Sequence, residues 1–245
     1  MLTYYKYPVT SIPLENYGAY FVNDNEAQYL IKNQIHNAEW MILQKIQDNE
    51  EGFFDFSKNM IDIGAFDGVY SFELPFQQRF MFEPNRERYF ICHANALLHG
   101  IHEQANIYNC AVGDHNGTIK FDGFCSGDYT DRPSWMVYES KEVPCITLDS
   151  MKEQLTNIGF IKIDIEGNEP YALAGAYEVI RNNNYPPILF ESWPNEYMDF
   201  GAGVPMETPD QYTRRVNALN NIFGELEYEV LEYWGDGQTH LAIHK

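Results

Sequence analysis

The segment Asn59–Ser71 constrains the fold more than any other part of the 245-residue chain. Its first half, Met60–Ile63, is mostly apolar and predicts a short buried strand, and Gly64 and Gly68 follow it closely. Glycines in such a turn allow the backbone to bend sharply and to pass close to a ligand, because they have no Cβ. The segment therefore predicts a strand that ends in a ligand-binding turn.

Acidic residues around this turn indicate the kind of ligand. Asp62 and Asp67 bracket it, whereas a turn that binds pyrophosphate points backbone amides at the anion. Carboxylates favour a ligand with a positive charge, an amino group and hydroxyls, as in S-adenosylmethionine. Glu83 ends a second apolar segment, 83 − 62 = 21 positions after Asp62, where an acid usually accepts the ribose hydroxyls of a nucleotide. Phe66 replaces the middle glycine of G-x-G-x-x-G, which counts against a nicotinamide cofactor.

Apolar segments and helical patterns alternate along the rest of the chain, which is typical of a doubly wound α/β sheet. We expect further strands at 79–83, 106–112, 118–121, 143–148, 160–167 and 186–191, and helices at 86–98, at 149–155 with Asp149 as N-cap, from Pro170 onward, and at 208–224. Tyr228–Trp234 and Thr239–His244 flank a glycine-containing turn and predict a hairpin. The fold class expected is a Rossmann-like class I methyltransferase, with a mostly parallel sheet ending in an antiparallel β-hairpin.

The chain is short enough for one domain, and we expect residues 1–245 to form it. Residues 1–22 predict an extended arm, and residues 25–47 predict two helices or one bent helix, so that the first 50 residues form an extension. The irregular segments 122–142 and 192–207 are candidates for loops over a substrate. Their aromatic residues are suited to stacking on a sugar ring or to ordinary packing: Tyr129, Trp135, Tyr138, Trp193 and Tyr197.

Composition excludes several classes of function. The formal charge is 16 − 36 = −20, which repels phosphate backbones and makes a nucleic-acid partner unlikely. The four cysteines form no Cys-x-x-Cys pair, which argues against a zinc site. The N-terminus has no signal-peptide pattern, and no apolar segment is long enough to span a bilayer. A cytoplasmic protein without a membrane partner is expected, and the sequence indicates no oligomeric state.

Five motifs occur in a fixed order: Ile61–Gly68, Phe82–Asn85, Asn109–Asp114, Thr147–Asp149 and Ile161–Gly167. Together they resemble the FkbM family of S-adenosylmethionine-dependent O-methyltransferases, over roughly residues 58–191. The resemblance implies that the turn binds the methionine part of the cofactor, that Glu83 binds the ribose and that adenine lies against Ala111 and Val112. The cofactor site expected comprises Asp62, Gly64, Ala65, Asp67, Gly68, Tyr70, Glu83, Asn85, Ala111, Val112 and Asp164.

This chain departs from the family pattern in two places. Pro75 interrupts the segment after the turn and shortens the helix expected there. The arm and helix before residue 50 lie outside the shared core. Both features affect the cofactor entrance and the choice of acceptor.

The predicted strand 160–167 carries the candidate catalytic residues. Lys162, Asp164 and Glu166 alternate with isoleucines, so their side chains share one face of the strand or line its carboxyl edge. Asp164 or Glu166 could accept the proton of an acceptor hydroxyl, or hold a divalent metal that acidifies it. Lys162 could stabilise an alkoxide or form a structural ion pair. Glu191 is a further candidate for the acceptor pocket.

The function expected is O-methylation of a sugar, a glycan or a secondary metabolite, with S-adenosylmethionine as cofactor and no metal assigned. The alternatives are an N-methyltransferase, a methyltransferase that acts on a nucleic-acid end, and a cofactor-binding scaffold without turnover. The joint presence of Asp62, Gly64, Gly68, Glu83 and Asp164 argues against the scaffold.

Overall fold

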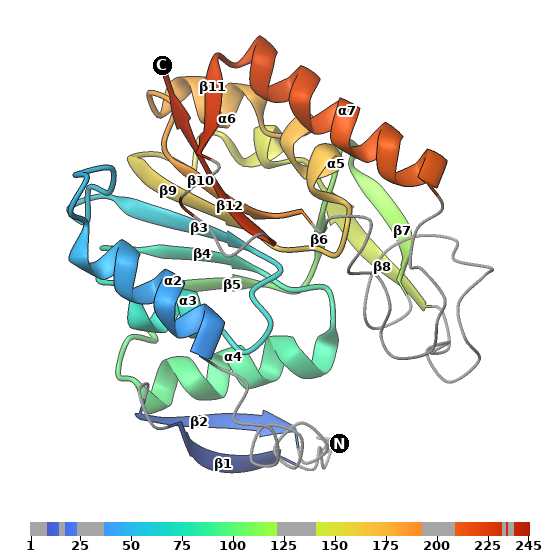
Figure 1. The fold of residues 1–245 in the computed structure, drawn as a ribbon. Helices are drawn as coiled ribbons and strands as arrows, with labels where there is room; N and C mark the ends of the chain where they lie inside the picture. Colours follow the sequence, from blue (N-terminus) through green and yellow to red (C-terminus); the bar gives the residue numbers. More distant parts are fainter. Residues whose placement is uncertain are drawn as a thin grey trace.

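The structure, a computed structural model, describes residues 9–14, 18–23, 37–121, 141–192, 209–231, 234 and 238–245. A seven-stranded sheet lies at the centre of these residues, in the order β11–β12–β10–β9–β3–β4–β5 (Figure 1). The strands are β3 (Asn59–Ile63), β4 (Arg79–Phe82), β5 (Ala105–Tyr108), β9 (Ile158–Ile163), β10 (Ile188–Glu191), β11 (Tyr228–Leu231) and β12 (Thr239–His244).

Strand directions in this sheet agree with the predicted fold class. Strands β5, β4, β3, β9 and β10 pair in parallel along the sheet. Strand β12 is antiparallel to both β10 and β11 and forms the terminal hairpin with β11. The carboxyl ends of the five parallel strands therefore meet at one edge, where ligands of open α/β sheets bind.

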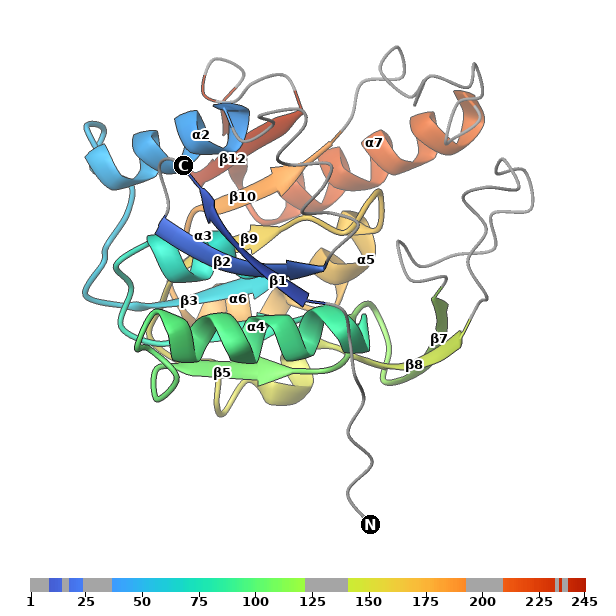
Figure 2. The same ribbon diagram turned by 90° about the horizontal axis from the view of Figure 1, so that it is seen from below.

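Helices cover both faces of the sheet (Figures 1 and 2). On one face lie α2 (Asn37–Asp48), α3 (Val69–Glu73) and α4 (Arg86–Leu98), which share a core cluster that includes Met60, Met81 and Phe160. On the other face lie the 3₁₀ helix η1 (Leu148–Met151), α5 (Glu169–Ala174), α6 (Tyr177–Asn182) and α7 (Pro209–Glu225).

The alternation of side chains along β3 and β9 determines where their charged residues lie. Met60 and Phe160 belong to the cluster on the α2–α4 face, whereas Ile61, Ile63, Ile161 and Ile163 belong to the cluster on the opposite face. Since side chains alternate along a strand, Asp62 and Lys162 lie on the α2–α4 face. They are also direct partners in the β3–β9 register.

The third predicted strand is divided between two sheets. Strand β5 ends at Tyr108, and Ala111–Val112 form a separate strand, β6. In a second sheet β6 pairs with β8 (Lys141–Ile146), which also pairs with β7 (Gly117–Phe121). Asn109 explains the division, because its side-chain amide donates to the carbonyls of Glu83 and Pro84 at 2.9 and 3.1 Å. These bonds hold the chain at the end of β4, and a single strand over 106–112 was therefore wrong.

Two other predicted elements are shorter than expected. Strand β9 ends at Ile163 rather than at 167, because Glu166 and Gly167 adopt φ values of 58° and 95° that no strand accommodates. The predicted helix at 149–155 is the short η1, and its N-cap is Thr147, whose hydroxyl accepts from the Ser150 amide at 3.2 Å. Asp149 instead accepts from the amide of Val179 at 2.9 Å.

The helix predicted from Pro170 onward is two helices, α5 and α6, which are separated at Gly175. A side chain at Gly175 would overlap the carbonyl oxygen of Gly113, so the close approach of that segment requires a glycine there, and the Gly175 carbonyl accepts from the amide of Asp149 at 2.9 Å. The predicted helix at 208–224 is α7, and Thr208 itself lies outside the described residues.

The N-terminal region contains more regular structure than an extended arm. Strands β1 (Val9–Leu14) and β2 (Gly18–Asn23) form an antiparallel pair, and β2 lies beside α4 (Figure 2). Helix α2 corresponds to the second half of the helical region predicted at 25–47, whose residues 25–36 are outside the described part. Most of the two aromatic-rich segments predicted at 122–142 and 192–207 also lies outside it, and of these segments the structure describes only residues 141, 142 and 192. None of the helices described is both long and apolar enough to span a bilayer.

Candidate active site

The turn after β3 needs a glycine because another backbone segment lies against it. Gly64 has φ of 75°, and a Cβ at this position would overlap the carbonyl oxygen of Asp164. The amides of Gly64 and Ala65 both donate to the carbonyl of Phe82, at 2.9 and 3.2 Å. The turn is thus held between the ends of β4 and β9, a constraint that the spacing of the glycines alone does not reveal.

An ion cluster with a buried centre, Lys162 and Asp62, joins β3 to β9 beside this turn. The Lys162 ammonium donates to the Gly64 carbonyl at 2.7 Å, and it lies 3.2 Å from Asp62 Oδ1 and 3.5 Å from Asp164 Oδ2. The other carboxylate oxygen of Asp62 accepts from the Ser71 hydroxyl of α3 at 2.7 Å. Buried charges are tolerated when they are paired and hydrogen-bonded. These contacts join Lys162 to the turn and to the carboxylates of Asp62 and Asp164.

Glu83 follows β4 directly and its carboxylate bridges two loops. One oxygen accepts from the amide of Phe66 at 2.9 Å and the other accepts from the amide of Asn85 at 2.7 Å. Burial raises the pKa of the Glu83 carboxyl to about 7, against the opposing effect of these two amides and of Arg88 and Lys162. The predicted acid therefore lies at this edge of the sheet, and its carboxyl group changes ionisation near neutral pH.

We expect Glu83 to make the free protein less stable as the pH rises. Its pKa is higher in the folded protein, about 7, than the ordinary value of 4.5. The stability that its protonation contributes is therefore complete below the ordinary pKa and is lost as the pH rises through the folded pKa. In Glu83→Gln this loss is absent. The difference in the free energy of unfolding between the variant and wild type should therefore shift in favour of the variant by about 3 kcal/mol from low pH to about pH 8.

Urea unfolding at both pH values measures this change. Glu229→Gln, on an exposed position of β11, removes the same charge and serves as the control. A Glu83→Gln difference that is the same at both pH values would contradict the expectation.

Asp67 is held by an arginine that the sequence did not single out. Arg88 Nη1 donates to Asp67 Oδ1 at 2.7 Å; the Asp67 side chain is buried and that of Arg88 is partly buried. The same guanidinium lies 3.7 Å from the centroid of the Phe66 ring, within the range of a cation–π contact. Asn95 donates to the Asp67 carbonyl at 2.9 Å. The predicted cofactor residue Asp67 thus anchors the turn to α4.

The remaining predicted cofactor residues occupy different surroundings. Asn85 is the N-cap of α4, where its side chain accepts from the amides of Glu87 and Arg88. Ala65 and Tyr70 are buried on the α2–α4 face, and Lys162 lies 5.5 Å from the Tyr70 ring centroid. Gly68, with φ of 85°, is the N-cap of α3. Ala111 and Val112 are buried in β6, in a sheet separate from the others.

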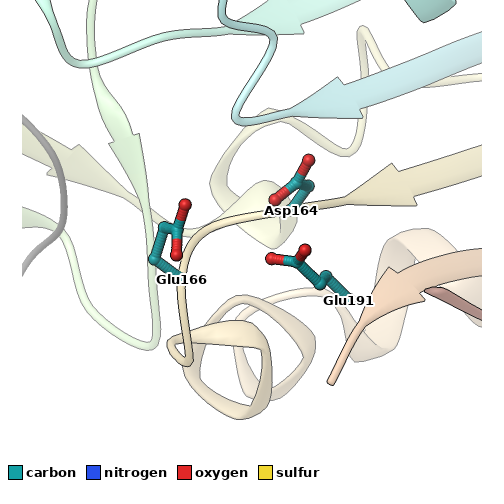
Figure 3. A group of neighbouring side chains, drawn as sticks. All are labelled: Asp164, Glu166 and Glu191. Atoms are coloured by element: carbon teal, nitrogen blue, oxygen red, sulfur yellow. The ribbon is translucent and has the colours of Figure 1, made fainter. Parts of the chain in front are cut away.

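Three carboxylates meet where β9 and β10 end. Asp164 follows β9, Glu166 lies two residues further along the turn, and Glu191 is the last residue of β10 (Figure 3). One oxygen from each lies within 4.8 Å of the others, and all three residues are partly buried. Such a group can accept a proton from a hydroxyl, and its oxygen atoms are also of the type that binds Mg²⁺ or Ca²⁺. The structure thus brings together two predicted catalytic residues and the predicted acceptor residue.

Sequence reasoning missed two residues behind this trio. Glu169 begins α5 and is completely buried. Arg215, which is distant in the sequence, lies on α7 and is also buried. Glu169 bonds to backbone amides of the turn that carries Glu166, and Arg215 donates to the hydroxyl of Ser192, which follows Glu191. The only local signal was a glutamate directly before Pro170, which also reads as an ordinary first-turn helix acid.

Comparison with known proteins assigns the chain to a family. A model described as the methyltransferase FkbM domain matches residues 62–202, which is more than half of the chain. The crystal structure of methyltransferase FkbM from Methylobacillus flagellatus KT has 18% sequence identity and a TM-score of 0.53. The match covers 82% of this chain and 48% of that one, so this chain spans about half its length. At this identity the likeness shows a shared fold.

A weaker structural match is ribosomal protein L11 methylase from Lactobacillus delbrueckii subsp. bulgaricus. It has 10% identity and a TM-score of 0.49, and the match covers 86% of this chain and 79% of that one. A search of curated proteins gave no match. The match at 62–202 contains most of the segment over which the motifs resemble the family, together with the β3 turn, Glu83 and the three carboxylates. The sheet order, the terminal hairpin and this match agree: the chain belongs to the FkbM methyltransferase family.

Proposed function

We propose that the protein transfers a methyl group from S-adenosylmethionine to a hydroxyl of a sugar, a glycan or a secondary metabolite. The observation that carries the proposal is the grouping of Asp164, Glu166 and Glu191 beside the β3 turn, within the segment that matches the family. This edge of the sheet offers an acid for ribose hydroxyls after β4 and, on the other side of β3, carboxylates after β9 and β10 for an acceptor.

The cofactor residues have complementary tasks in this proposal. S-adenosylmethionine, when bound, supplies a methyl group on a positively charged sulfur. The β3 turn and Asp62 bind its methionine part, Glu83 accepts hydrogen bonds from its ribose, and Ala111 and Val112 flank its adenine. Glu83 already accepts two backbone amides, but each carboxylate oxygen has a second lone pair available for a hydroxyl.

Asp164 is the residue to which we assign the hydroxyl proton. Methyl transfer to oxygen needs the acceptor aligned with the methyl group and its proton removed. Asp164 is the member of the trio nearest the turn, because its backbone amide donates to the Ile63 carbonyl at 3.0 Å. Glu166 and Glu191 then orient the acceptor, and Lys162 holds Asp164 and the turn in a fixed relation.

A thermal-shift experiment tests the cofactor. S-adenosylhomocysteine should raise the melting temperature of the protein, and NAD should leave it unchanged, because ligand binding stabilises the folded state by mass action. Glu83→Gln should reduce the affinity for S-adenosylhomocysteine by roughly 10-fold or more, as expected for hydrogen bonds lost to a charged group. Stabilisation by NAD and not by S-adenosylhomocysteine would refute the proposal.

A screen of hydroxylated acceptors tests the reaction. Sugars, glycans and hydroxylated metabolites are incubated with S-adenosylmethionine that carries a labelled methyl group, and transfer of the label is measured. Amine acceptors form the matched comparison, since label found only on nitrogen would replace O-methylation with N-methylation. Parallel assays with a chelator show whether the three carboxylates act through a bound divalent metal.

A further inference from the structure

The turn between β9 and α5 has an unusual backbone that needs support. Its first amide, that of Asp164, donates to the carbonyl of Ile63. Two residues later, Glu166 has φ of 58° and Gly167 has φ of 95°. The left-handed region costs a non-glycine residue roughly 1 kcal/mol or more. Because the backbone at Glu166 sets the direction of its carboxylate, whatever stabilises this conformation also orients that side chain toward Asp164 and Glu191.

Glu169 supplies this support from inside the protein. One oxygen of its carboxylate accepts from the amide of Ile165 at 3.2 Å and from the amide of Gly167 at 3.1 Å. These two amides flank Glu166, so a single atom fixes the backbone on both sides of it. Asn168 completes the turn, with its backbone and side-chain amides both donating to the Ile165 carbonyl.

The surroundings of Glu169 show that this carboxylate is not simply a solvated acid at a helix start. Its exposed fraction is 0%, and burial raises the pKa of the carboxyl to about 7 although the backbone amides and Arg215 oppose the shift. A buried acid is costly unless its hydrogen bonds repay the loss of water. The hydrogen-bond partners of its Oε1 are backbone amides of the turn.

Helix α7 connects this support to the other side of the trio. Its residue Arg215 is buried and acts electrostatically on Glu169, and it donates to the hydroxyl of Ser192 at 2.8 Å. Ser192 directly follows Glu191, the third carboxylate of the trio. Buried side chains of α5 and α7, two helices that pack together, therefore contact both the turn after β9 and Ser192 at the end of β10.

We propose that Glu169 is a positioning residue for methyl transfer: its buried carboxylate oxygen bridges the amides of Ile165 and Gly167 and so holds Glu166 and Asp164 in place for the acceptor. The inference rests on the proposed function of the trio. It assigns Glu169 no contact with cofactor or acceptor. The essential property of Glu169 is that its side chain is long enough to place an oxygen between these two amides, and its negative charge is secondary.

Two substitutions separate reach from charge. Glu169→Gln keeps an acceptor oxygen at the same distance along the side chain but removes the charge. Glu169→Asp keeps the charge but draws the oxygen back by one methylene. If the position of the oxygen is what matters, Glu169→Gln should retain kcat within about 3-fold. Glu169→Asp should lower kcat by roughly 10- to 100-fold, the loss expected when a catalytic group is misplaced by about 1 Å.

The measurements are chosen to distinguish positioning from a general loss of structure. Both variants should keep their affinity for S-adenosylhomocysteine, because Glu169 is not one of the residues assigned to the cofactor. Thermal shift measures this affinity. Hydrogen exchange of the Ile165 and Gly167 amides should accelerate in Glu169→Asp and stay slow in Glu169→Gln. The kcat and KM values are then measured with S-adenosylmethionine and the best acceptor from the screen above.

Three outcomes would overturn the inference. One is unchanged amide exchange in Glu169→Asp. A second is a kcat that falls in Glu169→Gln but not in Glu169→Asp, which would make charge the essential property. A third is an equal fall in turnover and in S-adenosylhomocysteine affinity, which indicates a collapsed site. If wild type methylates no hydroxyl, the proposed function fails, while amide exchange still decides whether Glu169 holds the turn.

Discussion

Gly64→Ala should lower the free energy of unfolding by about 3 kcal/mol or more, the size of effect that accompanies a strained backbone combined with a steric clash. The φ of 75° disfavours any residue with a side chain, and the added Cβ would overlap the Asp164 carbonyl oxygen and crowd Ile165. The backbone of Asp164, directly after β9, cannot move aside as a flexible side chain could. Urea unfolding measures the loss.

Gly100→Ala is the matched control for this substitution. Gly100 has a nearly equal φ of 70°, but a Cβ there has no neighbour within 4 Å. Its loss should therefore be only the conformational part, roughly 1 to 2 kcal/mol. The difference between the two variants isolates the contact between the turn and β9, and equal losses would show that this contact is relaxed at little cost. Where Gly64→Ala still folds, it should bind S-adenosylhomocysteine weakly, because the turn is displaced.

Asp164→Asn should reduce turnover by about 10²- to 10⁴-fold, the usual contribution of a general base. The substitution keeps the size of the side chain and removes its capacity to take a proton. Stability should change little, because the Asp164 side chain is 38% exposed and Lys162 retains Asp62 and the Gly64 carbonyl as partners. The quantity measured is kcat with S-adenosylmethionine and a hydroxyl acceptor.

The same controls decide between catalysis and cofactor binding at Asp164. Glu229→Gln removes an exposed carboxylate on β11 and should leave kcat unchanged. Affinity for S-adenosylhomocysteine should stay within a few fold in Asp164→Asn if the residue serves the acceptor. A strong loss of that affinity with normal kcat at saturation would make Asp164 a ligand of the cofactor amino group, and full activity would remove it from the mechanism.

Much of the architecture was predictable because it depends on neighbours along the chain. The apolar run at Met60–Ile63, the glycines after it and the acid at position 83 specify strands and a turn through local sterics and burial. The pattern at 228–244 specified the hairpin, which the strand pairing confirms. The five ordered motifs also identified the family before any tertiary contact was known, and the match at 62–202 confirms that identification.

Local patterns misled where a distant segment competes for the same backbone. The run Asn106–Val112 is apolar enough for one strand, but Asn109 binds the carbonyls that follow β4 and sends Ala111 into another sheet. Isoleucines at alternate positions extended the predicted strand to 167, but Glu169 draws the amides of Ile165 and Gly167 into a turn. In both cases a side-chain hydrogen bond overrides the alternation of apolar residues.

The sequence by itself thus determined the fold class and the family, and it singled out the three carboxylates near the ends of two strands. Only the tertiary structure decided what those residues contact. It placed Lys162 on Asp62, 100 positions away in the chain, and set Gly64 against the backbone of Asp164. It also paired Asp67 with Arg88 and put Glu169 behind the turn that carries Glu166. Periodicity reports which face a side chain occupies, whereas contacts between distant strands depend on register and on how closely two backbones approach.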